Sequence, residues 1–320
     1  MVYKVLLRKL SEALLTLFCA SLLIFTLIRL APGDPVELLL GRTTEAAASH
    51  TEAYDERVSE LRGQLGLDQS LLEQYMTWLK RLLHVDLGTS IHTGRQVSAE
   101  IAERLPATVV LSLSALLLQV VLGLFLGTVS ALKAGGAADS FIRLVCVVMA
   151  STPAFVIGLG LLSFFAVTAG LYEISSEASP GKLWLPALTL GLLGAPPLIR
   201  MVRAHMLTEL GQLYILSALS RGLDRKRVVQ HALRNALLPV IAMVALSLTG
   251  LMGGAVVMES IFSWPGLGKY ALDSILLKDY PVIQGYAVVM VSLVILIHLV
   301  VDVIYALLDP RIHRREEGRA

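Results

Sequence analysis

The chain has 320 residues, of which 55% are hydrophobic and 16% are charged, and its mean hydropathy is +0.71. Soluble domains carry about 25% charged residues, so this composition excludes an ordinary soluble domain and indicates an integral membrane protein. The net charge is only +2, and the basic residues gather in short loops between apolar runs, so we expect no nucleic-acid partner.

Residues 1–30 are predicted to be an N-terminal segment and a first transmembrane helix. Lys4, Arg8 and Lys9 precede an apolar run from Ala13 to Ile28. Basic residues ahead of a span place its N-terminus in the cytoplasm. No small-x-small cleavage site follows the run, so we expect the helix to be retained rather than removed as a signal peptide.

Residues 31–105 are predicted to be an extracytoplasmic insertion. They hold twelve acidic and seven basic residues, whereas basic loops are the ones that stay in the cytoplasm. Apolar side chains recur at helical intervals in the second half, at Leu61, Leu65, Leu72, Tyr75, Met76, Trp78, Leu79 and Leu82. This spacing predicts a small, mostly helical subdomain.

The remaining chain is predicted to be a transmembrane core at 106–310 and a cytoplasmic tail at 311–320. Its apolar runs cover residues 105–132, 144–172, 183–199, 235–258 and 280–301. About 20 residues suffice to cross a bilayer, and only the third run is shorter. We therefore expect an all-α membrane protein with six transmembrane helices, a basic turn at 133–143, and both termini in the cytoplasm.

The loop at 207–238 is longer and more basic than the other short loops. It holds five basic residues and two acidic ones, namely Arg221, Arg225, Lys226, Arg227 and Arg234 against Glu209 and Asp224. Tyr214 to Ser220 can form about two helical turns, Gly222 ends them, and Asp224 can cap a second helix. The pattern predicts two short helices that meet at a glycine on the cytoplasmic side. A basic loop that only orients the chain is the simpler alternative.

Several residues of this loop carry a family resemblance. Their order and spacing are similar to the cytoplasmic EAA loop of the membrane subunits of ATP-binding-cassette (ABC) importers, and they are Ala218, Gly222, His231, Arg234, Asn235 and Pro239. The acidic residue that opens the motif in many relatives is absent, because Leu216 and Ser217 precede Ala218.

Further motifs extend the resemblance along nearly the whole chain. They are RLAPGDP at 29–35, DLGTS at 86–90, RLPAT at 104–108, ESIFSWPGLG at 259–268, DYPVIQ at 279–284 and LDPRI at 308–312. Together they resemble the permeases of the dipeptide, oligopeptide and nickel branch.

The resemblance implies a type I importer permease in a bacterial inner membrane, which forms half of a translocation path. Such a subunit is not an enzyme and holds no cofactor, because ATP and Mg²⁺ are bound by two cytoplasmic ATPase subunits. A second, homologous permease and an extracytoplasmic substrate-binding protein are the other implied partners, with membrane lipid around the spans.

Three groups of functional residues are expected. Contacts with the ATPase are expected at Tyr214, Leu216, Ala218, Arg221, Gly222, Leu223, Arg225, His231, Asn235 and Pro239. Because small residues four apart let helices approach closely, packing against the second permease is expected at Gly123, Gly127, Gly250 and Gly254. Contacts with the binding protein are expected in the outer loop, at Trp264, Pro265, Gly266 and Gly268.

A self-sufficient carrier or channel is the alternative from another class. It predicts internal repeats and ionisable residues near the bilayer midplane, and the sequence shows neither. The chain also contains no G-x-x-x-x-G-K-[ST] nucleotide motif. An uncharged path that is driven by an ATPase on another chain explains both observations.

Two substrate classes remain open. Three stretches resemble nickel permeases, namely WLKRLLHVDLG at 78–88, RAHMLTELGQLYILSALSRGL at 203–223 and DYPVIQ at 279–284. Nickel or a nickel chelate is therefore preferred over di- or oligopeptides. Met201, His205 and Met206 are candidate soft or borderline ligands, but they also fit packing at the cytoplasmic boundary, so no metal site is assigned.

Overall fold

The structure, a computed structural model, describes residues 2–30, 59, 68–174 and 177–308. Most of the predicted insertion and the whole tail at 311–320 lie outside the described residues. The regular elements within the described ranges are helices, namely α1 (Val2–Leu30), α4 (Leu71–Leu83), α5 (Val97–Leu132), α6 (Ala137–Ser151), α7 (Ala154–Leu162), the π-helix η2 (Ser163–Thr168), α8 (Pro180–Leu210), α9 (Leu213–Ser220), α10 (Arg225–Ile261), α11 (Leu267–Leu277) and α12 (Tyr280–Leu308).

Five of the described helices are long and apolar enough to cross a membrane. Their spanning portions are Arg8–Leu30, Val97–Leu132, Pro180–Leu210, Pro239–Ile261 and Tyr280–Asp302. A sixth span results if α6 crosses together with the α7–η2 segment, which is bent from it by 102°. The all-α, multi-span fold expected from the sequence is therefore confirmed.

The bend lies at Thr152 and Pro153, inside the run that the sequence assigned to one span. Thr152 has an extended backbone and Pro153 caps α7, because proline cannot donate the hydrogen bond that would continue α6. The preceding turn is shorter than predicted, since α6 already begins at Ala137. Asp139 closes this turn by accepting hydrogen bonds from Gly135 N (3.0 Å) and Ser130 Oγ (2.5 Å).

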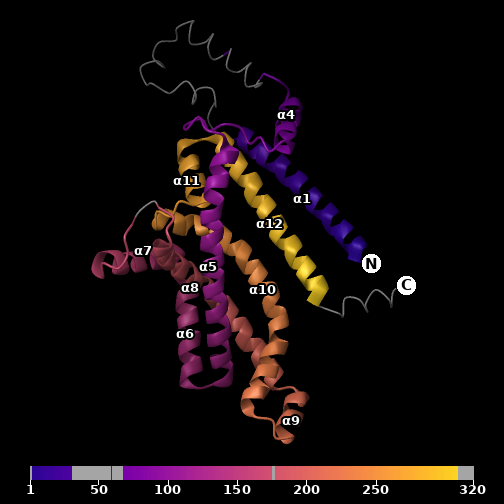
Figure 1. Cartoon of the computed structure of the whole chain (residues 1–320), viewed down its shortest axis with the longest axis vertical. Coiled ribbons are helices and arrows are strands. Elements are labelled where there is room, and N and C mark those ends of the chain that lie inside the picture. Colours follow the sequence, from indigo (N-terminus) through magenta and orange to yellow (C-terminus); the bar gives the residue numbers. More distant parts are fainter. Residues whose placement is uncertain (1, 31–58, 60–67, 175–176, 309–320) are drawn as a thin grey trace. The chain divides into compact units, whose positions relative to one another are not determined.

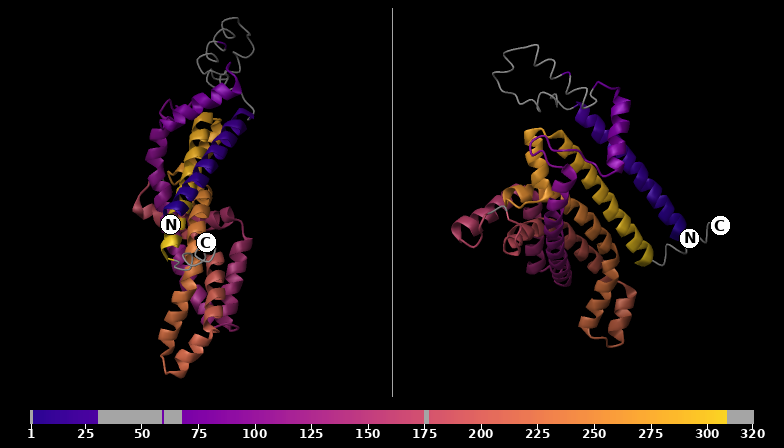
Figure 2. Two further views of the ribbon diagram at one scale, coloured as in Figure 1. Left: turned by 90° about the vertical axis from the view of Figure 1, so that its right-hand side faces the viewer. Right: turned by 45° about the horizontal axis from the view of Figure 1, so that its top comes forward.

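The described chain forms two compact units, one of residues 1–103 with 270–320 and one of residues 104–269. In the first unit α1 runs beside α12 (Figures 1 and 2), and Lys9 Nζ lies 2.9 Å from Asp302 Oδ2. α4 packs on α1 through the rings of Phe25 and Tyr75, whose centroids are 5.4 Å apart. A capping box between Ser70 and Glu73 starts α4, which confirms the helical pattern in this part of the insertion.

In the second unit α8 is the central helix. It packs against α6, α7 and α10, and α5 and α6 form a hairpin beside it (Figure 1). α8 contains three internal prolines, Pro186, Pro196 and Pro197. Two apolar clusters hold the unit together, one around Leu185 and Phe262 and one around Leu198 and Ile215. The second cluster fixes the loop between α8 and α10.

Candidate functional site

The loop between α8 and α10 contains the short helix α9 (Figure 1), so the first of the two predicted short helices is present. α9 ends because Gly222 adopts a positive φ of +77°, a conformation that glycine reaches without strain. Gly222 N donates to Leu219 O (2.9 Å) and Leu223 N donates to Ala218 O (3.1 Å), which together form a Schellman cap. Asp224 is then the N-cap of α10, so the turn between the two helices has a defined geometry.

The inner face of α9 is apolar and buried. Ile215 is 3% exposed and lies in the cluster with Met206 of α8 and Val228 of α10. Full burial of such a side chain contributes about 1.5–3 kcal/mol. Ala218 packs at the edge of the same cluster, where its small side chain lets α9 lie close to its neighbours. The burial therefore fastens α9 to the ends of two long helices.

Three hydrogen-bonded side chains, Glu209 of α8, Tyr214 of α9 and Asn235 of α10, join the same three helices, and we call them the polar clasp. The Tyr214 hydroxyl donates to Glu209 Oε2 at 2.7 Å, and Asn235 Nδ2 donates to the Tyr214 oxygen at 3.0 Å and to Glu209 Oε2 at 3.4 Å. Burial and the neighbouring Glu209 raise the pKa of Tyr214, while the Asn235 hydrogen bond lowers it to a smaller extent. The phenol stays protonated at neutral pH and keeps its hydrogen bond to Glu209. The clasp therefore fixes the orientation of α9, in addition to the position that the buried Ile215 gives it.

The outer side of α9 carries an apolar stripe. Leu213, Leu216 and Leu219 are 79%, 56% and 46% exposed, and residues three apart lie along one side of a helix. Arg221 and Arg225 are exposed next to it. An apolar stripe beside cations on a rigid helix offers no catalytic chemistry, but it has the properties of a protein-docking surface.

Other residues predicted at this site have different surroundings. Leu223 is half-buried in the apolar cluster and His231 is exposed on α10. The structure corrects the second predicted short helix, because it continues through Pro239 as α10 and into the span Pro239–Ile261. The contact of Pro239 with the ATPase stays a prediction. Packing of the α10 residues around Pro239 onto α8, among them Ala236 and Val240, keeps the helix intact.

The predicted glycine faces are only partly open to a second permease. A Cβ on Gly123 would lie 2.5 Å from Leu198 Cδ2, and one on Gly127 would lie 2.7 Å from Val202 Cβ. These two glycines thus serve the packing of α5 on α8 within the chain, which corrects the expectation for them. Gly250 has no atom within 4 Å of a Cβ position, and Gly254 has Leu190 Cδ1 at 3.5 Å. Packing of Gly250 and Gly254 against a partner stays a prediction.

The outer loop is built around a buried carboxylate that sequence reasoning missed. Glu259 is fully buried and accepts hydrogen bonds from Thr108 Oγ1 (2.6 Å) and Lys269 N (2.9 Å). A side chain at Gly266 or Gly268 would overlap this carboxylate. The sequence does carry a signal for this buried carboxylate: a glutamate ends an apolar span, and glycines follow it seven and nine residues later.

This arrangement corrects the predicted contacts with a binding protein. Trp264 is 3% exposed and its Nε1 donates to Ala107 O at 2.9 Å. Gly266 and Gly268 are likewise buried, since the loop folds inward to enclose Glu259. Pro265 is half-buried, and its contact with a partner stays a prediction.

A second missed interaction joins α6 to α8. Asp139 is fully buried, and Arg203 donates to both of its carboxylate oxygens at 2.8 Å. The two residues are 64 positions apart, so no local pattern links them. The pair anchors the α5–α6 hairpin to the part of α8 that leads into α9.

The candidate metal ligands are not arranged as a metal site. Met206 is fully buried in the apolar cluster, whereas Met201 and His205 are half-buried. Within the described ranges, no group of three or more His, Cys, Asp or Glu side chains could hold a metal ion. Met206 therefore serves packing.

Comparison with known families gives two matches that together cover nearly the whole chain. Residues 119–314 match the family described as binding-protein-dependent transport system inner membrane component, and residues 2–112 match the N-terminal region of the same kind of membrane component.

Curated relatives and solved structures agree with these matches. A di/tripeptide transport system permease protein of Pseudomonas aeruginosa is 38% identical, with 96% of this chain and 98% of the relative covered. A glutathione transport system permease protein of Escherichia coli K12 is 35% identical, with 95% and 97% covered. A chain of the MetNI methionine ABC transporter in an inward-facing conformation aligns with a TM-score of 0.56 at 17% identity, over 65% of this chain and 96% of that chain. That alignment supports the fold.

Proposed function

Because the chain belongs to the family of binding-protein-dependent transport system inner membrane components, and is therefore a permease subunit of an ABC importer in the inner membrane, we propose that it carries small peptides. The observation that supports the substrate class is the 38% identity to a di/tripeptide permease over nearly the full length of both chains.

The relatives favour peptides over the nickel preferred from the sequence. The glutathione permease is named for a tripeptide, so both relatives described above point to the same chemical class. The nickel preference depended on the resemblance of residues 78–88, 203–223 and 279–284 to nickel permeases. Of these, residues 203–223 form the end of α8, α9 and the turn after it. Residues 203–223 contain α9 and several of the residues that hold it in place. The resemblance of this segment to nickel permeases therefore gives no support for a nickel-coordinating site.

Partners follow from the family. A binding-protein-dependent importer has a substrate-binding protein and ATPase subunits. We further propose that this chain pairs with a second, homologous permease, that two ATPases bind ATP and Mg²⁺ for the complex, and that this chain is itself non-catalytic. The sequence supports the last point, since it lacks a nucleotide P-loop.

We assign the ATPase contact to the outer side of α9. The leucine stripe enters a groove of the ATPase, and Arg221 and Arg225 pair with acidic groups at its rim, which sets the register more than the affinity. The Schellman cap, the buried Ile215 and the clasp make α9 rigid with α8 and α10. Closure of the ATPase then moves both long helices together.

Uptake by the reconstituted transporter tests the proposed function. Vesicles contain the permease pair and ATPases, and the binding protein is added outside with a labelled di- or tripeptide or with nickel ions. We expect ATP-dependent accumulation of the peptide and none of nickel. Accumulation of nickel without peptide uptake would return the substrate to the nickel branch, and uptake without ATP would favour a secondary carrier.

A further inference from the structure

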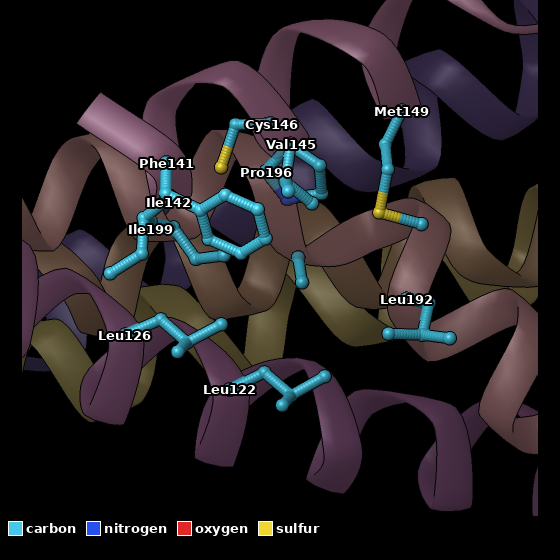
Figure 3. A pocket seen from close by; sticks show the side chains of 11 residues that line it. Leu122, Leu126, Phe141, Ile142, Val145, Cys146, Met149, Leu192, Pro196 and Ile199 are labelled. Carbon is cyan, nitrogen blue, oxygen red and sulfur yellow. The ribbon is translucent and has the colours of Figure 1, made fainter. Parts of the chain in front are cut away.

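A groove open to the outer surface lies between α5, α6 and α8 within the second unit. It has a volume of about 130 Å³, similar to the apolar cavities of roughly 150 Å³ that admit a benzene-sized ligand. Its lining is apolar, and Figure 3 shows side chains of all three helices around it. They include Leu122, Leu126, Val145, Cys146, Ala195 and Ile199.

The floor of the groove is tightly packed, whereas its wall is open. Cys146, Ala195 and Ile199 are at most 5% exposed and form one apolar cluster. Phe141 and Val145 stand on the wall and are 67% and 39% exposed. Since α5 and α8 are long and apolar enough to be spans and α6 belongs to the bent pair, the groove lies in the membrane-spanning part of the chain.

An arginine that has no ion-pair partner among the described residues follows the groove lining along α8. Arg200 follows Pro196 and Ile199 of the lining along α8 and is exposed. Its charge acts on the Cys146 thiol in the floor. Arg203, about one turn further, is held by Asp139, whereas no described residue forms a salt bridge with Arg200. The groove thus combines an apolar slot that takes a segment of an acyl chain with an available cation.

We propose that this groove binds an acyl chain of an anionic phospholipid, whose phosphate is held by Arg200. Long basic side chains place their charge at headgroup depth while the stem stays in hydrocarbon. A guanidinium also binds phosphate through paired hydrogen bonds. A zwitterionic lipid offers the same chain but no net charge, so charge distinguishes the ligand from the bulk bilayer. This site is separate from α9 and does not depend on which substrate is carried.

Photocrosslinking tests the site directly. The complete transporter is reconstituted in phosphatidylcholine vesicles that contain a trace of phosphatidylglycerol with a diazirine on its acyl chain, and labelled residues are mapped by peptide mass spectrometry. We expect labelling at Val145, Cys146 and Ala195. The same diazirine on phosphatidylcholine should label these residues about fivefold less, the effect of one cation near an anionic headgroup.

Three variants separate the contributions of charge and shape. Arg200→Gln should reduce labelling by phosphatidylglycerol to the level of phosphatidylcholine. Arg143→Gln, at an exposed arginine of α6 that does not line the groove, should leave it unchanged. Val145→Trp fills the slot from its exposed wall and should reduce labelling by both lipids. ATP hydrolysis by each variant checks that the complex is assembled.

Two results would overturn the proposal. Equal labelling by the two lipids, or full phosphatidylglycerol labelling of Arg200→Gln, would show that Arg200 selects no headgroup. Absence of groove labelling with either lipid would show that protein covers the groove, with the second permease as the occupant to examine.

Discussion

At the scale of residues, buried polar side chains join segments that are far apart in the chain. Glu259 ties α10 to Thr108 of α5 and to the backbone after the outer loop. Asp139 ties α6 to Arg203 of α8. A buried polar group stabilises a fold only while its partners are present, and removing one partner leaves the others unsatisfied. The stability of the fold is therefore sensitive to changes at these residues.

Glu259 gives the first prediction. Glu259→Ala removes the acceptor for the Thr108 hydroxyl and the Lys269 N–H, and each buried unsatisfied group costs about 1–3 kcal/mol. The unfolding temperature of the purified complex should fall clearly, with a smaller fall for Glu259→Gln, which keeps one acceptor oxygen. An unchanged unfolding temperature for Glu259→Ala would contradict the role given to the carboxylate.

Gly222 gives the second prediction. No atom lies within 4 Å of a Cβ at this position, so a substitution is opposed by the positive φ and not by crowding. A left-handed backbone costs an L-residue about 1–2 kcal/mol, and asparagine tolerates it better than most. Gly222→Val should lose more peptide uptake per assembled complex than Gly222→Asn. Equal uptake by the two variants would show that the turn does not need this conformation.

At the scale of elements, α9 is held by three sets of contacts: the buried Ile215, which we call the apolar anchor, the Schellman cap and the polar clasp. The clasp joins all three helices through hydrogen bonds between side chains. Because α9 is short, its stability comes from these contacts and not from helix propensity.

The third prediction concerns the clasp. Tyr214→Phe keeps the ring but removes the hydroxyl that Glu209 and Asn235 share. We expect faster amide hydrogen exchange in α9, with ATP hydrolysis less dependent on substrate. Ser220→Ala is the control, because its hydroxyl bonds only within α9, to Leu216 O. Exchange as slow as in the unaltered protein would mean that the apolar anchor and the Schellman cap fix the helix without the clasp.

Local signals predicted α9 well and long-range contacts poorly. Gly222 and Asp224 mark a turn by their own conformational preferences, so the end of α9 and the start of α10 follow from the sequence. The sequence predicts a short second helix, whereas α10 continues through Pro239, since packing on α8 overrides the local preference of proline. The Glu259–Thr108 contact joins residues 151 apart, and no periodic pattern encodes such a pair.

At the scale of the whole molecule, the proposed function has the permease turn ATPase motion into movement of its spans. That account requires α9 to lie on the cytoplasmic side and α4 on the opposite side. The basic loop composition supports this orientation.

The fourth prediction tests this topology with single cysteines in a chain whose Cys19 and Cys146 are replaced by serine. Met76→Cys on α4, at a 47% exposed position, should react with an impermeant maleimide in intact cells. Lys133→Cys, exposed in the α5–α6 turn, should react only after the inner membrane is opened. The reverse pattern would invert the topology and remove α9 from the ATPase.

The central claim is that the leucine stripe of α9 couples the ATPase to the translocation path. The most direct measurement compares Leu216→Asn with Leu216→Met in reconstituted vesicles and records, for each, ATPase bound per permease, substrate-stimulated ATP hydrolysis and peptide uptake. Leu216 is 56% exposed, so neither change should unfold the spans. We predict that the asparagine variant loses uptake together with ATPase binding or substrate-stimulated hydrolysis, and that the methionine variant keeps all three. Full uptake by Leu216→Asn would contradict the account.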